Sequence, residues 1–137
     1  MRRCTLGQFD TDFGDRRLLH GALRRWAAVK PEAAALVNHN RGRAVSWAEF
    51  DTLTTTIAAG LRRLGFRKGD FLATSLTFLT EHVLLEYACF KIGVIHAPLD
   101  LRLPPAEAIR CLSAIHPKGF AFLGKTPNAD FGELGKA

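Results

Sequence analysis

The sequence predicts an α/β fold: a partial parallel sheet with helices on its faces, and a small antiparallel hairpin beside it. Three observations lead to this prediction. Three short apolar runs have the length of buried strands, the segments between them repeat apolar residues at helical spacing, and Gly, Pro and Asp residues separate the two kinds of segment. Strands and helices that alternate in this way form right-handed crossover units on a parallel sheet.

Composition places the chain among folded domains. Its 137 residues allow one compact domain or a piece of a larger one, and 47% hydrophobic with 23% charged residues is typical of globular proteins rather than disordered ones. No apolar run approaches the roughly 18 residues that a membrane span requires. Because the N-terminus also lacks a signal-peptide pattern, we expect a cytoplasmic protein with no membrane span.

Cysteines and basic residues indicate no special partner. Cys4, Cys89 and Cys111 are odd in number and never form a Cys-x-x-Cys pair, which fits a reducing compartment and predicts neither a disulfide nor a metal site. The formal net charge of +6 comes from scattered doublets such as Arg62-Arg63. Proteins that bind single-stranded nucleic acid interleave basic residues with exposed aromatics, whereas here the aromatics occupy core-like positions. We therefore expect no nucleic-acid partner.

The first half of the chain predicts a helix, a hairpin and a second helix. Residues 17–29 repeat apolar side chains at helical spacing, and Pro31 ends that helix. Short extended stretches at 34–38 and 43–46 flank a turn at 39–42. Ser46 and Glu49 form a capping box that starts a helix at Trp47, and Gly65 ends it in a left-handed conformation. Its expected buried stripe consists of Trp47, Phe50, Leu53, Ile57, Leu61 and Leu64.

The second half predicts three strands joined by two helices. A strand at 71–76 leads to a helix from Thr80, its expected capping residue, to Ile92, and Gly93 ends this helix. The helix is apolar nearly all round, so it must be covered on most sides. A strand at 94–97 precedes a helix that starts at 104–105, places Ile109 and Leu112 inward and ends at 116–117. The last strand is 119–123.

These elements divide the chain into three parts. Residues 1–16 form an N-terminal arm, residues 17–125 form the α/β subdomain, and residues 126–137 form a polar C-terminal tail that contains glycine and no further strand.

One segment of the sequence matches a phosphate-binding motif. Residues 119–126 match the phosphate-binding formula of Gly, four residues, then Gly-Lys-Thr. That loop must follow a strand, wrap its amides around phosphate and open a helix. Here the four middle residues are bulky and strand-like, a helix end precedes them, and no helical period follows. We interpret the match as a strand, and a small NTPase that uses Lys125 remains the less favoured alternative.

No other catalytic or ligand-binding pattern is present in the sequence. It contains no dinucleotide fingerprint, no nucleophile elbow and no histidine spacing typical of zinc sites. Four carboxylates are the candidates near predicted strand ends, and each serves equally well as a capping or surface group: Asp70, Glu81, Glu86 and Asp100. We therefore assign no catalytic, cofactor-binding or metal-binding residue.

The order and spacing of several segments nevertheless resemble the opening of the AMP-forming acyl-adenylate family, which includes acyl-CoA ligases, peptide-synthetase adenylation domains and luciferases. The resemblance covers roughly three quarters of the chain. Departures lie near Phe78, where the family usually has an Asn, and at Asp100-Leu101, where it usually has Asn-Pro. The segments that carry the resemblance are Pro31–Val37, Val45–Phe50, Gly60–Gly65 with Lys68-Gly69-Asp70, Ala88–Ile95, Ala97–Leu99, the helix at Glu107, and Pro117–Phe120.

The resemblance implies an N-terminal scaffold fragment of an acid-CoA ligase. A complete parent would use ATP and Mg to form an acyl-adenylate, which the thiol of CoA then attacks. The family's phosphate loop and catalytic lysine have no counterpart in these residues, so we expect a fragment that is not active alone and binds no cofactor itself. Its expected partner is the remainder of the ligase. Alternatives are a stand-alone interaction module or partner subunit, and self-association through an open sheet edge.

Overall fold

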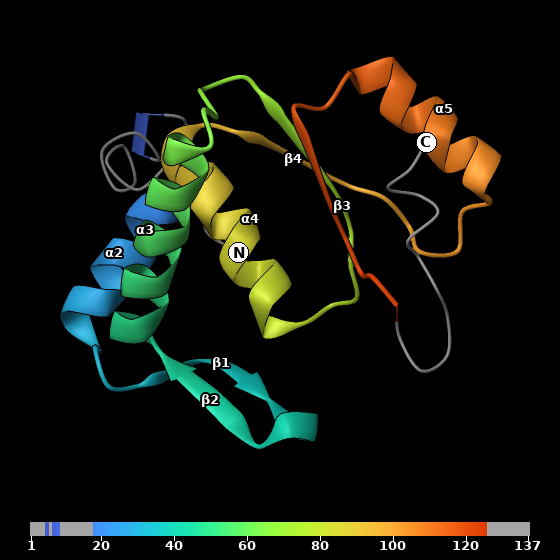
Figure 1. The fold of residues 1–137 in the computed structure, drawn as a ribbon. Helices are drawn as coiled ribbons and strands as arrows, with labels where there is room; N and C mark the ends of the chain where they lie inside the picture. Colours follow the sequence, from blue (N-terminus) through green and yellow to red (C-terminus); the bar gives the residue numbers. More distant parts are fainter. Residues whose placement is uncertain (1–4, 6, 9–17, 126–137) are drawn as a thin grey trace. The chain divides into compact units, whose positions relative to one another are not determined.

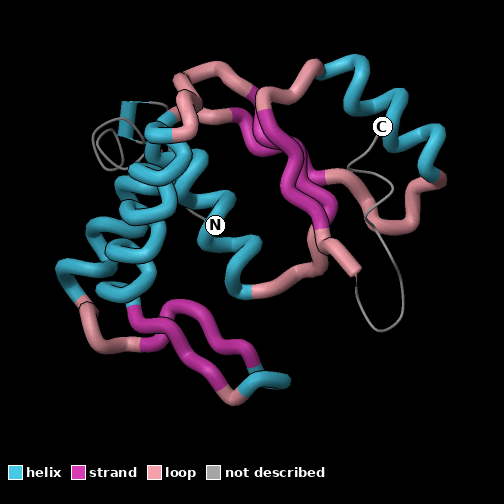
Figure 2. Tube along the Cα trace, viewed as in Figure 1, coloured by secondary structure: helices cyan, strands magenta, loops and turns pink. Residues whose placement is uncertain are grey.

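The structure, a computed structural model, describes residues 5, 7–8 and 18–125 (Figures 1 and 2). The order of helix, hairpin, helix and three strands joined by helices is as predicted. The chain divides into two compact units, residues 1–52 and 53–137, with the division inside helix α3. The elements are α2 (Leu19–Val29), β1 (Ala34–Asn38), the 3-10 helix η2 (His39–Arg41), β2 (Arg43–Ser46), α3 (Trp47–Arg63), β3 (Phe71–Ser75), α4 (Thr80–Ile92), β4 (Ile95–Pro98), α5 (Pro105–Ile115) and β5 (Gly119–Phe122).

The first unit contains α2 and the hairpin. Strands β1 and β2 pair in antiparallel fashion, and Gly42 adopts the left-handed conformation, with φ of 58°, that the turn requires. The side chain of Asn38 accepts a hydrogen bond from the Arg41 amide within that turn. The indole rings of Trp26 and Trp47 lie 6.0 Å apart between centroids. The predicted hairpin is therefore confirmed.

Helix α3 starts and ends as its sequence predicts. The Glu49 amide donates to Ser46 Oγ at 3.2 Å, and the Ser46 amide donates to Glu49 Oε2 at 2.8 Å, which completes the capping box. At the other end Gly65, with φ of 91°, reverses the chain, and the Phe66 amide donates to the Leu61 carbonyl. This Schellman motif also satisfies the Arg62 carbonyl.

The predicted buried stripe of α3 is wrong at its last residue; of the others, Phe50 and Leu61 are buried, and Trp47, Leu53 and Ile57 are half-buried. Leu64 is 76% exposed, whereas Phe66, two residues later, is 5% exposed and belongs to the core. The reversal at Gly65 explains the exchange, because it aims the residue after the glycine back at the helix and leaves Leu64 on the solvent side.

The second unit is built on a three-stranded parallel sheet in the order β4-β3-β5. β4 lies on one side of β3 and β5 lies on the other side. The connection from β3 to β4 and the connection from β4 to β5 therefore run in opposite directions across the sheet. Two right-handed crossovers in opposite directions put their helices on opposite faces. Figure 1 shows this arrangement, with α4 on one side of the sheet and α5 on the other.

The core of this unit lies between α3, α4 and the sheet. Its buried members are Ala58, Leu61, Phe66, Leu72, Ala88, Cys89 and Val94. Helix α4 has the predicted bounds, and Gly93 ends it with φ of 69°. Thr80 is not its cap, however: Leu79 takes that position without a side-chain hydrogen bond, and Thr80 is the first helical residue.

Helix α5 also differs in detail from its prediction. Ala108 is its buried residue, whereas Ile109, which we expected on the inner face, is 38% exposed. Leu112, one turn after Ala108, is half-buried as expected. A rotation of one residue moves a side chain by about 100° around the helix, and the apolar pattern of a short helix does not fix its facing that finely.

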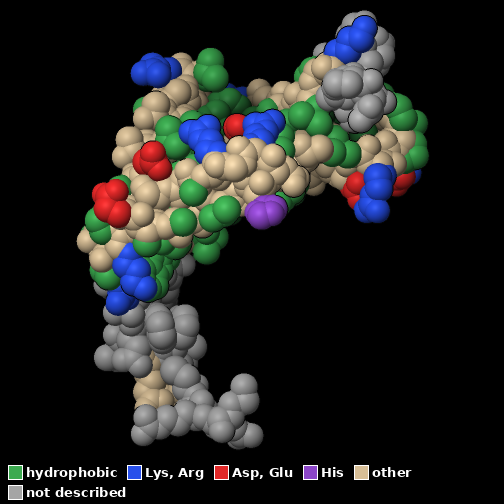
Figure 3. All heavy atoms as spheres, turned by 90° about the horizontal axis from the view of Figure 1, so that it is seen from below, with side chains coloured by type: hydrophobic (Ala, Val, Ile, Leu, Met, Phe, Trp, Pro, Cys, Tyr) green, Lys and Arg blue, Asp and Glu red, His purple; other side chains and the backbone are tan. Residues whose placement is uncertain are grey.

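The predicted boundaries between arm, subdomain and tail fall at residues 16 and 126. Both of these residues lie outside the described ones, and the boundaries stay predictions. Among the helices of the described residues, none has both the length and the apolar character needed to cross a membrane. On the face drawn in Figure 3, Lys and Arg side chains are interspersed with apolar and acidic groups.

Candidate functional site

The central strand β3 carries buried polar residues toward its carboxyl end. Thr74 and Ser75 are 0% and 3% exposed, although they follow the buried apolar residues Leu72 and Ala73. Ligand sites of parallel α/β sheets form at the carboxyl ends of the strands. A buried hydroxyl at this place needs a hydrogen-bond partner, and its partners identify the first candidate site.

Two histidines from neighbouring elements meet at Thr74. His82 comes from the first turn of α4, and His96 comes from β4, in register with Leu72 of β3. Thr74 Oγ1 lies 2.9 Å from His96 Nε2 and 3.2 Å from His82 Nε2, and the two Nε2 atoms are 3.3 Å apart. The rings meet edge to face, with 5.2 Å between centroids. Three polar atoms thus form a closed triangle, which we call the histidine cluster.

Glu86 completes the histidine cluster from α4, one helical turn after His82. Its Oε1 lies 3.6 Å from Nδ1 of His96, whose side chain is 4% exposed, while the Glu86 side chain is 38% exposed. Burial lowers the pKa of His96 below its usual value of 6.5; the Glu86 carboxylate opposes this shift and His82 adds to it. His96 is therefore neutral near pH 7.

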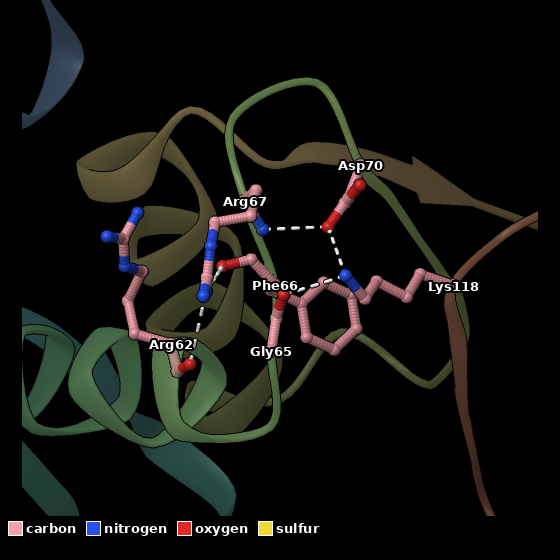
Figure 4. Close-up of polar contacts among 6 residues, drawn as sticks. All are labelled: Arg62, Gly65, Phe66, Arg67, Asp70 and Lys118. Atoms are coloured by element: carbon pink, nitrogen blue, oxygen red, sulfur yellow. Dashed lines mark hydrogen bonds and ion pairs between the residues drawn. The ribbon is translucent and has the colours of Figure 1, made fainter.

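The second candidate site surrounds Asp70 at the opposite end of β3. Lys118 Nζ lies 2.8 Å from Asp70 Oδ2 and 2.7 Å from the Gly65 carbonyl oxygen, so one ammonium joins β5, β3 and the end of α3 (Figure 4). The Arg67 amide donates to the same Asp70 oxygen at 2.7 Å. These bonds from Lys118 and Arg67 hold the pKa of Asp70 below its usual 3.8. We call this group the lysine cluster.

The lysine cluster has the character of a structural clamp. Each of its polar groups has a partner within the cluster, and the guanidinium of Arg67 turns back to the carbonyls of Phe66 and Arg62 (Figure 4). It lies at the amino ends of the strands, away from the edge where ligands bind in such sheets. Its chemistry is to fix the α3–β3 connection against β5.

The carboxylates considered from the sequence are not brought together by the structure. Asp70 belongs to the lysine cluster and Glu86 to the histidine cluster. Asp100 forms an exposed ion pair with Arg102, at 2.6 Å, that lowers the Asp100 pKa to about 2, and Glu81 is an exposed residue in the first turn of α4. Within residues 5, 7–8 and 18–125, no three His, Cys, Asp or Glu side chains are grouped as metal ligands.

The apparent phosphate-binding loop is a strand. Gly119 to Phe122 form β5, and they pair in parallel with Leu72 to Ser75 of β3. Backbone amides committed to a sheet are not free to wrap around a phosphate. The strand prediction is thus confirmed, while Thr126, the last residue of the formula, lies outside the described residues.

Sequence reasoning missed the histidine cluster. His82 and His96 are 14 residues apart on different elements, and no metal-ligand spacing connects them. The available signal was a polar pair, His82 and Glu86, at i and i+4 among the mostly apolar central residues of a helix, followed by a histidine within an apolar strand. Polar residues that face a sheet need partners from that sheet.

Comparison with known proteins gives a consistent result. A sequence model of the family described as AMP-binding enzyme matches residues 23–130. Long-chain fatty acid transport protein 1 of Bos taurus is 33% identical over 111 residues, which are 79% of this chain and 17% of that protein. Propionate–CoA ligase of Escherichia coli is 30% identical over 88 residues, covering 61% of this chain and 14% of the ligase.

Solved structures agree with the sequence relatives. A fatty acyl CoA synthetase of Mycobacterium tuberculosis superimposes with a TM-score of 0.72 at 28% identity, over 75% of this chain and 20% of that one. The N-terminal domain of FACL13 from the same organism gives 0.74 at 27% identity, over 77% and 27% of the two chains. This chain therefore spans less than a third of each protein that it matches here.

Proposed function

Because the chain belongs to the AMP-binding enzyme family, we propose that it serves as the N-terminal framework of an AMP-forming acid-CoA ligase. The observation that carries this proposal is the β4-β3-β5 sheet with its covering helices, whose fold is that of the N-terminal domain of acyl-CoA synthetases. In the complete ligase a carboxylate would attack the α-phosphate of ATP, with Mg²⁺ stabilising the phosphates, and CoA would then attack the acyl-adenylate.

In this proposal the chain contributes scaffold rather than chemistry. Its two polar clusters are engaged in internal hydrogen bonds, and the first four residues of its phosphate-binding formula form strand β5. The groups that bind ATP, Mg²⁺ and CoA would belong to the remainder of a ligase, together with the pocket for the acid. We also propose a cytoplasmic location, since this is where ATP and CoA are available to such an enzyme.

The remainder of the ligase is the partner that the sheet favours. Strands β4 and β5 each have one neighbour among the described strands, which leaves one edge of each for further pairing. Phe120 and Phe122 stack with 5.2 Å between ring centroids on one face of β5, and every residue of this strand is only half-buried. Without its partner, the chain is expected to self-associate through these edges, and light scattering over a range of concentrations measures this.

Isotope exchange between ATP and pyrophosphate tests the proposal. The 137-residue chain is incubated with ATP, Mg²⁺ and a panel of carboxylic acids, with Escherichia coli propionate–CoA ligase and propionate as the working control. We expect exchange by the control and none by the chain. Exchange by the chain above the protein-free background would show that it performs the chemistry itself.

A second measurement addresses the NTPase alternative. We expect no saturable binding of ATP by isothermal titration calorimetry, either for the wild type or for Lys125→Ala. Saturable binding by the wild type that Lys125→Ala abolishes would favour a nucleotide site at the end of β5 and would contradict the framework role.

A further inference from the structure

The neighbours of each ring nitrogen in the histidine cluster indicate where its proton lies. Glu86 Oε1 lies 3.6 Å from Nδ1 of His96, which is beyond hydrogen-bond distance, but its negative charge favours a proton on that nitrogen, and we assign the proton to Nδ1 of His96. Nε2 of His96 is then an acceptor, and the Thr74 hydroxyl, 2.9 Å away, donates to it. These protons are assigned from the partners that each atom has.

His82 takes the opposite tautomer. Its Nδ1 is buried without a hydrogen-bond partner in the described structure, and a bare lone pair there costs less than an unpaired N–H. Nε2 of His82 therefore carries the proton and donates to Thr74 Oγ1 at 3.2 Å. The closed triangle thus contains two donated protons and one acceptor nitrogen, that of His96.

We propose that the histidine cluster is an acid-sensitive lock, which holds the start of α4 on strands β3 and β4 only while the imidazole of His96 is neutral. A proton added to Nε2 of His96 removes the acceptor of the Thr74 hydroxyl. It also sets two N–H groups against each other across 3.3 Å. Thr74 is fully buried, so water cannot supply the lost acceptor without an opening of the helix from the sheet.

One neighbouring charge favours a protonated His96, that of Glu86 on α4. It does not outweigh the effect of burial, to which His82 adds. Cys89, also on α4, is neutral because burial raises its pKa to about 12. Strand β3 contributes Thr74 and Ser75, which are uncharged, and no group from β5 or α5 contributes to the His96 pKa.

The separation of the two Nε2 atoms also permits a competing occupant. Two imidazoles on one tetrahedral zinc ion lie at about this distance, since Zn–N bonds are roughly 2.0–2.1 Å. We favour the proton because the cluster offers only two imidazoles and a hydroxyl, and because Glu86 faces Nδ1 of His96 rather than the triangle. Zinc is therefore included in the test as the alternative.

The first measurement is nitrogen NMR of the imidazoles in the 137-residue wild type. We expect His96 protonated on Nδ1 and His82 on Nε2 at pH 7.5, with His96 titrating below 6.5. A mixture of the two neutral tautomers at both rings, or a titration midpoint of His96 at or above pH 6.5, would overturn the proposal. This readout needs no variant and stays valid if a substitution prevents folding.

The second measurement is the unfolding equilibrium as a function of pH. Folding lowers the pKa of His96, so the unfolding constant is expected to rise as pH falls below 6.5. The rise is up to about tenfold per pH unit and continues until the folded-state pKa of His96 is reached. The variant His82→Gln/His96→Gln should show a weaker rise between pH 7.5 and 5.5. The control, His39→Gln/His116→Asn, changes two exposed histidines and should follow the wild type.

Two further measurements follow the local opening of α4 and the effect of zinc. Amide hydrogen exchange in α4, corrected for the intrinsic effect of pH, should accelerate at pH 5.5 relative to that in α3 of the wild type. An unchanged pH dependence in the double glutamine variant would contradict the lock. A rise in melting temperature on addition of zinc at pH 7.5, if the double glutamine variant abolishes it, would also contradict the lock and would indicate a metal site instead.

Discussion

The two ends of strand β3 hold their neighbours by opposite means. At the amino end, Asp70 pairs with Lys118, whose side chain is 40% exposed. Toward the carboxyl end, Thr74 joins two imidazoles, and the side chain of His96 is 4% exposed. Both clusters connect three elements, yet the first is centred on an ion pair, whereas the buried triangle of the second consists of a hydroxyl and two imidazoles.

Access of water explains the difference. A partly exposed carboxylate keeps its hydration and gains hydrogen bonds from Lys118 and Arg67, and its pKa falls and its charged form is favoured. A buried imidazole loses its hydration, so its pKa also falls, but for a base this favours the neutral form. Both pKa values are lowered, which keeps the acid Asp70 charged and the base His96 neutral. The following changes test that contrast, in order of expected effect.

Thr74→Val should have the largest effect, because it removes the hydroxyl while nearly keeping the side-chain shape. Two buried imidazole nitrogens lose their shared partner, and we expect a loss of about 1–3 kcal/mol in the free energy of unfolding. Chemical denaturation at pH 7.5 measures it. Thr77→Val, at an exposed threonine of the following loop, is the matched control and should change stability by less than about 0.5 kcal/mol. Equal losses in the two variants would refute a special role for Thr74.

Gly93→Ala changes the end of α4 without touching either cluster. Gly93 has φ of 69°, and a Cβ there would lie 2.8 Å from Cγ of Lys68. We expect a destabilisation of about 1–2 kcal/mol, since a left-handed backbone is costly for alanine. Gly60→Ala is the control in a helix interior with open space, and it should be neutral or stabilising by up to about 1 kcal/mol. Thermal denaturation distinguishes the two signs.

Lys118→Met should cost less than Thr74→Val, because water partly replaces the lost partner of Asp70. The loss should shrink in 1 M salt if the ion pair carries it. The pKa of Asp70 is lowered, so its contribution is present above 3.8 and is lost as pH falls through the folded-state value. Denaturation curves between pH 5 and 2 should therefore converge for wild type and variant. An unaltered difference at pH 2 would argue for alkyl packing instead.

Arg102→Gln should have no measurable effect on stability. Arg102 is 89% exposed, and its ion pair with Asp100 is screened although it is short, at 2.6 Å. A midpoint of denaturation equal to that of the wild type is expected. A clear destabilisation would place this pair with the lysine cluster rather than with ordinary surface pairs.

Much of the fold was predictable because its signals are local. The capping box at Ser46–Glu49 and the glycine ends at Gly65 and Gly93 depend on backbone groups within a few residues, which the sequence itself specifies. Short apolar runs between such signals are too short for helices, which favours strands, and this is also why the start of the phosphate formula at 119–126 could be interpreted as a strand.

The tertiary structure alone decided which groups meet and which face is covered. Leu64 and Ile109 are as apolar as their buried neighbours, and their exposure depends on how the chain reverses and how a helix is rotated on the sheet. The histidine cluster depends on β4 lying beside β3, which brings together residues 14 and 22 positions apart. The sequence by itself determined the elements and their ends through short-range hydrogen bonding. Pairing across the sheet determined the buried polar contacts, because nothing in local spacing encodes a partner on another strand.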